Sequence, residues 1–556
     1  MKHSKMFMVV FSLALLAVFV TSPGLAATRH IYLAATDGYV YMPDGFQSGA
    51  ANPGVPFGGP GNWQGTPDAS YLAVAGTPPA SGPNVGTPNW GTATPGFGAA
   101  MNLPNGTPGA EDVRGYIRGF VGCRQPQGGP TAWNPAVDCP PPGTAVLPAP
   151  IIDVNQMDHV FLHLVNLGNR NPMIAPDAHN IHLHGMHVTT QNDGFNEFSF
   201  EAPVPTTPYV YDTNGNLVSV GAGFTPVTYY FLAEHAGTYM YHCHVEASEH
   251  VQMGLYGALI IRPPGYAAAV ANRRPFVYDG LHNDFFDVNT ATGAPQEFIL
   301  LFSEYDSKEH GMVGMGIPFH HPEFRPDYFL LNGRSFPDTI RPVNSTYFTE
   351  GIADVGPPPV WSGPPRGWVA GSNNFATYNG LIAVDLGNKG RPEGFGKKFL
   401  LRMIGLGFTH TPMHIHGWHF KMVGKDASPV PRTAQLDGEF TLNLASGSTY
   451  DLIISADCKA GVGQYSEQSI SSRGVFGAAD KAFLSLGGFP PQDGSWLPDG
   501  SPIPSPNPYV IGDNVLSVQL YPLHSHHDHT VTNDGIYPGG AVAVILAANP
   551  AGGTCQ

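Results

Sequence analysis

The sequence is poor in charged residues, which fill 12% of its 556 positions, roughly half the share that is usual in soluble proteins. This shortage argues against coiled coils, long solvent-exposed helices and charged tails, because each of these needs many charged side chains. Basic residues are the scarcer kind, with 26 Lys and Arg against 42 Asp and Glu and a net charge of −16. A nucleic-acid partner is therefore not expected, since phosphate binding requires a basic face.

Apolar runs long enough to span a membrane are missing too, and the longest run lies at the start of the chain. Residues 1–27 open with Lys2 and Lys5, continue with an apolar stretch over 7–20 and close on the small residues at 25–27. This pattern is typical of a Sec-type signal peptide, with an uncleaved anchor as the alternative. We expect a secreted or periplasmic protein with no transmembrane segment, and with 24 basic against 42 acidic residues once 1–27 are removed.

Cysteine is also rare, and the five cysteines are an odd number for an exported chain. Cys123 and Cys139 lie close together in a Pro/Gly-rich segment and predict a short disulfide loop. Cys458 and Cys555 predict a second bridge that would tether the end of the chain. Cys243 is left over between two histidines, where a free thiol needs burial or a metal ion.

Glycine and proline are abundant, at 69 and 55 residues, while 42% of the chain is hydrophobic and 11% aromatic. Short apolar runs between many turn residues predict an all-β protein of sandwiches or barrels. The expected strands cover residues 30–42, 150–166, 227–233, 238–243, 255–261, 298–306, 328–336, 397–405, 440–444, 450–455 and 541–547.

The chain divides into two similar halves. After the signal peptide we expect one domain over residues 28–267, with a low-complexity insertion at about 43–110, and a second domain over 268–556. A further Gly/Pro-rich insertion is expected between residues 338 and 381. Each half carries an HxHG motif in its middle and a His-x-His motif near its last strands, which indicates an internal duplication.

Histidines are concentrated in four short windows, which hold 15 of the 24. Residues i and i+2 of a strand face the same way, so a His-x-His motif presents two imidazoles on one side. The four pairs are His182 with His184, His242 with His244, His414 with His416, and His524 with His526. Surface histidines in polar turns are the alternative, but four pairs at duplicated positions favour a cluster of several borderline-soft metal ions.

A second metal site is indicated around Cys243. A buried thiolate, two imidazoles and a distant thioether form the trigonal blue-copper site used for electron transfer. His179 before the first pair, and His250 and Met253 after Cys243, supply these groups. Since Cys243 also separates His242 from His244, the chain offers a short covalent path from this site to the cluster.

These motifs, HNIHLHG and HCH followed by a histidine and a methionine, resemble the copper motifs of the multicopper oxidases, the laccase family. The resemblance implies two cupredoxin-like Greek-key β-sandwich domains and four coppers per chain: one type 1, one type 2 and two type 3. It implies type 1 ligands at His179, Cys243, His250 and Met253. It implies cluster ligands at His182, His184, His242, His244, His414, His416, His524 and His526.

The sequence departs from the family pattern at several positions. Laccases usually place the second type 1 histidine five residues after the cysteine, where this chain has Ser248, so His250 is the nearest candidate. In the second half Thr411 stands at the place of His179 and Ser525 at that of Cys243, so we expect no blue site there.

Four other histidines accompany the second-half pairs. His410 and His419 are expected to be bystanders or to support the ligands. His527 and His529 form another same-face pair in HSHHDH, but YPLHSH aligns with YMYHCH, so we prefer His524 and His526.

Reduction of dioxygen to water consumes protons, so an acid near the cluster is expected. Asp193, in the turn QNDG, resembles the acid that multicopper oxidases keep after HxHG, with ordinary turn chemistry as the alternative. Glu249 beside His250 is a second, weaker candidate. His320 and His321 in FHHPEF suggest a further metal or substrate site, although a polar loop is the favoured interpretation.

The resemblance therefore implies an oxidase that takes single electrons from a phenolic or metal-ion substrate at type 1 copper and reduces O2 by four electrons. A copper nitrite reductase and a non-catalytic copper electron-transfer or storage protein are the alternatives. Two-domain relatives are homotrimers with the cluster between chains, which implies a homotrimer here. The long insertions leave open a cluster within one chain.

Overall fold

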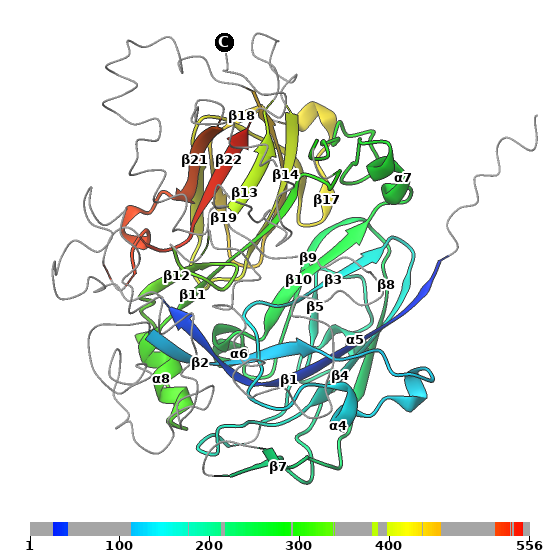
Figure 1. Cartoon of the computed structure of the whole chain (residues 1–556), viewed down its shortest axis with the longest axis vertical. Helices are drawn as coiled ribbons and strands as arrows, with labels where there is room; N and C mark the ends of the chain where they lie inside the picture. The colour runs from blue at the N-terminus through cyan, green and yellow to red at the C-terminus, as the bar shows by residue number, and fades with distance from the viewer. Residues whose placement is uncertain are drawn as a thin grey trace, which may run out of the picture.

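The computed structural model describes residues 26–42, 113–175, 177–212, 217–290, 293–336, 339, 381–386, 397–435, 437–457, 518–533, 535 and 539–548 (Figure 1). These residues form strands and only short helices, so the predicted all-β class is confirmed. The longest described helix is α8 (Ser307–Gly314). The expected signal peptide up to residue 25 and the insertion at about 43–110 lie outside the described residues, as does nearly all of the second insertion.

Two four-stranded sheets make up the first half of the described chain. One sheet has the order β2 (Val113–Gly122), β1 (Thr28–Met42), β4 (His159–Asn166), β8 (Val227–Leu232). The other has the order β3 (Ala149–Asn155), β10 (Tyr256–Arg262), β9 (Gly237–His242), β5 (His182–His184). Their facing sides share one apolar core, which includes Leu162 and Phe231 from the first sheet and Tyr241 and Leu259 from the second.

The second half repeats this plan with extra strands. Its first sheet runs β12 (Tyr328–Leu331), β11 (Glu297–Tyr305), β14 (Lys397–Gly405), β20 (Thr449–Ala456), β16 (Phe420–Lys425), β17 (Ser428–Pro429), with β18 (Asp437–Glu439) on β16. Its second sheet runs β13 (Leu381–Asp385), β22 (Val542–Ala548), β21 (Val518–Ser525), β15 (Thr411–Ile415), β19 (Thr441–Leu444).

Each strand of the two four-stranded sheets in the first half has a counterpart in the second half, in the same order. In each half the first strand pairs in parallel with the fourth, β1 with β4 and β11 with β14. In each half the histidine strands pair antiparallel at an edge region, β5 with β9 and β15 with β21. The boundary expected between residues 267 and 268 falls inside α7 (Tyr266–Ala271) and stays a prediction.

Several strand predictions need correction. The single strand expected over 150–166 is two strands, β3 and β4, because the chain turns at Met157 with φ 70°. The strand expected over 328–336 ends at Leu331, where a turn with Asn332 at φ 55° follows. Strands β2, β13 and β16 were not expected from the sequence pattern, whereas β5, β15 and β21 carry His-x-His residues that were interpreted as strand residues.

The halves pack together through an apolar layer and a buried ionic network. Residues of β9 and β10, including Met240 and Ile260, pack against Leu301 of β11 and Ile404 of β14. This contact explains why every residue of β9 is buried, since the strand lies between two apolar surfaces.

Arg402 is the centre of the ionic network between the halves and is fully buried. It contacts Glu297 and Asp451, and its guanidinium donates to Thr238 Oγ1 of the first half at 2.8 Å. Glu297 also pairs with Arg262 of β10. Burial opposes the charge of Glu297, but the two guanidinium groups outweigh it and lower the carboxyl pKa to about 2. Buried ion pairs and hydrogen bonds therefore join the two halves in addition to the apolar packing.

The Cys123–Cys139 disulfide is present as predicted, and Cys243 is free and buried. Cys458 and Cys555 lie outside the described residues, so their bridge stays a prediction. No helix among the described residues has the length and apolar character needed to cross a membrane.

Candidate metal centre

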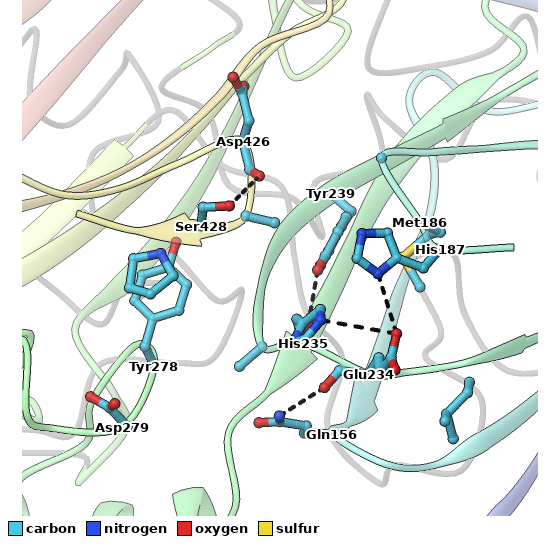
Figure 2. Close-up of a pocket in the computed structure, with 15 residues that line it drawn as sticks. Gln156, Met186, His187, Glu234, His235, Tyr239, Tyr278, Asp279, Asp426 and Ser428 are labelled. Carbon is cyan, nitrogen blue, oxygen red and sulfur yellow. Dashed lines mark hydrogen bonds and ion pairs between the residues drawn. The ribbon is translucent and has the colours of Figure 1, made fainter. Parts of the chain in front are cut away.

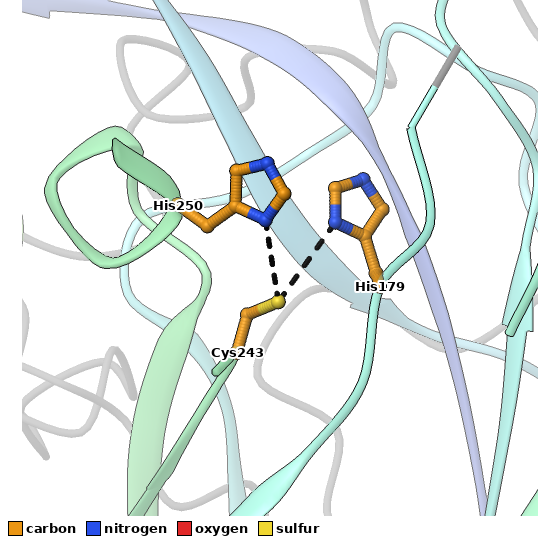
Figure 3. A group of neighbouring side chains, drawn as sticks. All are labelled: His179, Cys243 and His250. Carbon is orange, nitrogen blue, oxygen red and sulfur yellow. Dashed lines mark hydrogen bonds between the residues drawn. The ribbon is translucent and has the colours of Figure 1, made fainter. Parts of the chain in front are cut away.

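One buried thiol and two buried imidazoles converge in the first half (Figure 3). Cys243 Sγ lies 3.5 Å from Nδ1 of His250 and 3.9 Å from Nδ1 of His179. All three side chains are buried, and their ligand atoms lie within 4.8 Å of one another. One thiol and two imidazole nitrogens aimed at a common point are the donor set of a trigonal copper site.

The chain brings His250 back to Cys243 through a tight turn. Strand β9 ends at His242, and α6 (Ala247–Met253) starts after Glu246, whose φ of 42° reverses the chain. Helix α6 ends at Gly254 with φ 117°, and a Cβ there would come within 2.9 Å of Arg118 O. Glycine at this position therefore lets α6 lie close to β2.

Asn180 connects the thiol to the main chain of His244, and the sequence motifs did not predict this role. Its amide oxygen accepts a hydrogen bond from His244 N at 2.7 Å and lies 3.7 Å from Cys243 Sγ. Its amide nitrogen donates to Gly194 O at 2.7 Å. Its position directly after His179 was the only sequence signal available.

Asp177 and Arg118 orient the ring of His250, and the sequence motifs predicted neither residue. Asp177 Oδ2 lies 2.9 Å from His250 Nε2 and 3.1 Å from an Arg118 guanidinium nitrogen. Nε2 carries a proton when it donates to Asp177, which leaves Nδ1 free to bind a metal. Burial opposes a charged His250, but hydrogen bonds to Asp177 and Cys243 outweigh it and raise the pKa to about 9, so at neutral pH a metal ion would have to displace the proton on Nδ1.

Met253, the expected axial ligand, is fully buried at the last position of α6. Its cluster of apolar neighbours consists of Tyr116, Ile174 and Val313, and Cys243 belongs to a different cluster. Its role as a ligand stays a prediction.

The two histidine pairs of the first half form one group, which we call the first quartet: His182, His184, His242 and His244. Neighbouring ring centroids lie 5.0 to 5.9 Å apart. His182 and His242 face each other in the ladder between β5 and β9. Burial lowers the pKa of His242 to about 3, so this imidazole is neutral and able to bind a metal.

Asp193 supports the first quartet through its backbone as well as its carboxylate. His182 Nδ1 donates to Asp193 O at 2.6 Å and lies 3.2 Å from Asp193 Oδ2. The following Gly194 has φ 82°, and a Cβ there would lie 2.1 Å from Ile181 O. Glycine at position 194 therefore lets the Asp-Gly turn pack against Ile181, which brings Asp193 close enough to orient His182. The turn conformation and the contact with His182 thus depend on the same two residues.

The second half holds an equivalent group, the second quartet: His414, His416, His524 and His526. Neighbouring ring centroids lie 4.8 to 6.1 Å apart. His414 faces His524 in the ladder between β15 and β21, just as His182 faces His242. The structure places His527 against His410 and His529, away from this quartet. His419 lies against Phe440.

Backbone carbonyls orient the same ring nitrogens in both quartets. His242 Nδ1 donates to Cys243 O at 2.9 Å, and His524 Nδ1 donates to Ser525 O at 2.8 Å. His414 Nδ1 donates to Phe440 O at 2.7 Å. A proton fixed on Nδ1 leaves Nε2 for a metal ion, which is the arrangement that metal-binding histidines adopt. The donor sets of both quartets and of the Cys243 site therefore fit copper.

The two quartets make no direct contact with each other among the described residues. Among the described residues, no hydrogen bond or ring contact joins a histidine of the first quartet to one of the second. His416 and His526 are exposed in the second quartet, whereas no histidine of the first is.

Glu249 and the FHHPEF segment lie beside the His250 site. Glu249 Oε1 is 3.4 Å from an Arg118 guanidinium nitrogen, on the side of His250. His321 Nδ1 is 3.4 Å from Oε1 of Glu309, whose side chain has no exposed surface. Burial, together with nearby Asp306 and Glu249, raises the pKa of Glu309 to about 8. A proton-donor role for Glu249 stays a prediction.

The solved structures that resemble the chain include multicopper oxidases and a copper nitrite reductase. They include the multicopper oxidase mgLAC (20% identity, TM-score 0.40, 78% of this chain and 80% of that chain). They also include a blue copper oxidase from Nitrosomonas europaea (22%, 0.38, 72% and 77%) and a copper nitrite reductase from the same organism (13%, 0.36, 73% and 86%). No curated protein matches the sequence.

One family model matches part of the first half of the chain. The model described as "Multicopper oxidase" matches residues 127–265, a stretch that contains the Cys243 site and the whole first quartet. Copper is the metal that this family implies. The resemblance to the multicopper oxidases that the histidine motifs predicted is thus confirmed.

Proposed function

We propose that this protein is an exported, laccase-like multicopper oxidase that couples one-electron oxidation of a phenolic or metal-ion substrate to four-electron reduction of O2 to water. The observation that carries the proposal is the buried Cys243 thiol, which faces two imidazole Nδ1 atoms and lies between two histidines of the first quartet. The signal-peptide pattern of residues 1–27 supports export.

Four coppers per chain are proposed. His179, Cys243 and His250 would hold the type 1 copper, with Met253 as its axial ligand, and the two quartets would hold the type 2 and type 3 coppers. Bound copper would supply one-electron oxidation of the substrate at the Cys243 site and reduction of O2 at the histidine cluster. The backbone of residues 242–244 links the two sites covalently.

Residues around the Cys243 site have positioning roles in this proposal. Asp177 accepts a hydrogen bond from His250 Nε2, and Arg118 holds the Asp177 carboxylate in place through an ion pair. Asn180 fixes the main chain at His244. The site is therefore formed before metal binding, which lowers the reorganisation that a change of copper charge would demand.

Protons for O2 reduction would come through Asp193 or Glu249. Asp193 has the better position, because its carboxylate lies 3.2 Å from His182 of the first quartet. Glu249 contacts Arg118 instead, so its path to a quartet would be longer.

A homotrimer would complete the cluster. The first quartet of one chain would meet the second quartet of the next, and three such head-to-tail contacts close a ring. Support comes from the lack of contact between the quartets within the described residues of one chain, and from the exposure of His416 and His526.

Copper counting combined with turnover assays tests the function. Four coppers per chain with O2 uptake on a phenolic dye or on Mn(II) would support the oxidase. Two coppers with nitrite turnover would instead establish the nitrite reductase, which needs only three histidines at its catalytic copper. Bound copper without turnover of either acceptor would indicate an electron-transfer or storage protein.

A further inference from the structure

A third group of metal-binding side chains lies away from the Cys243 site and from both quartets. His187, Glu234 and His235 line the mouth of a cavity of about 450 Å³, and their side chains point toward one another (Figure 2). The opposite wall of the cavity comes from the second half of the chain and includes Tyr278 and Asp426.

The spacing of these three groups suits a single ion. His187 Nδ1 lies 3.3 Å from Glu234 Oε2, His235 Nε2 lies 3.9 Å from the same oxygen, and all ligand atoms lie within 4.8 Å. Two ligands bound tetrahedrally at about 2.0–2.2 Å from an ion are separated by roughly 3.3–3.6 Å. Only small side-chain rotations would therefore bring the three atoms around one ion.

The backbone that carries the three ligands is fixed in place. Glu234 and His235 form an exposed two-residue turn between Ala233 and Ala236, which are both buried. The Gln156 amide donates to Glu234 O at 2.8 Å.

A hydrogen bond from Tyr239 and apolar packing beside His187 also hold the backbone of the three ligands in place. The Tyr239 hydroxyl donates to His235 O at 3.0 Å. On the facing loop, Met186 and Val188 on either side of His187 pack against the core of the first half. The ligands are thus presented on rigid structure, which reduces the entropy lost when an ion binds.

We propose that His187, Glu234 and His235 bind a divalent transition-metal ion of the borderline class, such as Zn²⁺ or Cu²⁺. Two imidazoles and one carboxylate are the protein ligands of known three-ligand zinc sites, and imidazole also favours copper over hard cations. The ligand side chains are 47% to 70% exposed, so the open coordination position would face water in the cavity.

This metal site is additional to the four coppers of the proposed function. His187 follows His184 of the first quartet by only three residues, but its Nδ1 faces Glu234 rather than the quartet. A chain that binds metal at all of these positions would carry five ions, so the two proposals predict separable stoichiometries.

Zinc titration of the copper-loaded protein tests the proposal. Calorimetry with ZnCl2, followed by mass-spectrometric metal counting, should find one zinc per chain in addition to the resident copper. His235→Ala and Glu234→Gln each remove one of three ligands, so each should weaken zinc binding at least tenfold. Both variants change exposed side chains, and unchanged absorption of the Cys243 site would show that they fold.

His282→Ala provides the matched control. His282 lies 2.9 Å from Asp279 and forms a histidine–carboxylate pair at the same side of the molecule, but without a second imidazole. Zinc binding should be unchanged in this variant. Equal zinc affinity in the wild type and in His235→Ala would overturn the proposal, and so would a wild type that takes up no zinc and carries no more copper than His235→Ala, whether or not the protein is an oxidase.

Discussion

The two halves of the chain place histidines in the same register yet differ in the residue between them. His182 faces His242 in the first half and His414 faces His524 in the second, and the flanking carbonyls of Cys243 and Ser525 orient equivalent Nδ1 atoms. The thiol and α6 with His250 occur only in the first half of the described residues, where the second half has a hydroxyl and a short 3-10 helix, Asp528–Thr530.

This difference separates two tasks that share one scaffold. A paired-histidine edge can be duplicated without a thiol, because the ladder and the backbone carbonyls alone position the imidazoles. The electron-accepting site needs more: a thiol, a helix that returns His250, and the Asp177 carboxylate that fixes its ring. We therefore expect substitutions at matched positions of the two halves to have unequal effects.

Removing the thiol should have the largest effect. Cys243→Ser should abolish the intense thiolate-to-copper absorption near the red end of the spectrum while cluster copper remains bound. The matched change Ser525→Cys should add no second band, because Thr411 occupies the position of His179 and supplies no imidazole. Absorption spectra and copper counts measure both, and a Cys243→Ser protein that stays blue would refute the assignment.

Mixing two inactive variants tests whether the halves of different chains cooperate. His184→Ala and His416→Ala should each abolish O2 reduction, because each removes a cluster ligand from a different half. In a head-to-tail ring, random reassembly of equal amounts should restore about one quarter of the sites, where two intact halves meet. Refolding from a common denatured mixture, with O2 uptake and light scattering as readouts, measures this. A competent monomer, or a mixture that stays inactive, would argue against a cluster between chains.

Breaking the ionic network should destabilise the contact between halves within one chain. Arg402→Met leaves Glu297 and Asp451 buried without their common partner, and loss of one member of a buried pair costs about 3–5 kcal/mol. Urea unfolding should show this loss. The control, Glu323→Gln, removes an exposed pair with Lys308 and should leave the unfolding midpoint unchanged. A similar midpoint for both variants would show that the network contributes little.

A smaller, pH-dependent change in the free energy of unfolding is expected from Glu309. This residue lies in α8, a helix of the second half that packs on β2 of the first half. Its pKa is about 8 in the folded chain against an ordinary value of 4.5, so the folded state retains a proton that the unfolded state has released. The associated stability is full below pH 4.5 and is lost as the pH rises through 8.

Between pH 6 and pH 8 this loss should amount to about 1–2 kcal/mol. Glu309→Gln cannot ionise, so its unfolding free energy should fall less than that of the wild type over the same range. Denaturant unfolding at several pH values measures the difference. Parallel pH profiles for the two proteins would place the titration elsewhere.

The sequence predicted the long apolar strands and the histidine pairs because both depend on local pattern. Strand β2 was missed because Gly115 and Gly119 look like turn residues. The structure explains Gly115 by packing: a Cβ there would lie 1.6 Å from the Tyr305 hydroxyl. Strands β5 and β15 are only three and five residues long, and the His-x-His motifs were their sole sequence signal.

Residues that support the metal centre were harder to predict because their partners are distant in sequence. Arg118 and His250 lie 132 positions apart but 2.8 Å from each other. Asp177 and Asn180 flank His179 and could be noticed only by proximity. Nothing local in the sequence indicates which side chain will orient a ring across two strands, so these roles required the three-dimensional structure.

The separation of the two quartets has a kinetic consequence for the proposed trimer. Each chain would contain a complete electron-accepting site. It would contribute its first quartet to one O2-reducing cluster and its second quartet to another. Dilution below the trimer dissociation constant would then lower the specific activity, because mass action removes clusters while the blue absorption stays in every chain. Enzyme concentration would thus act as a regulator of turnover, and colour and catalysis would follow different concentration curves.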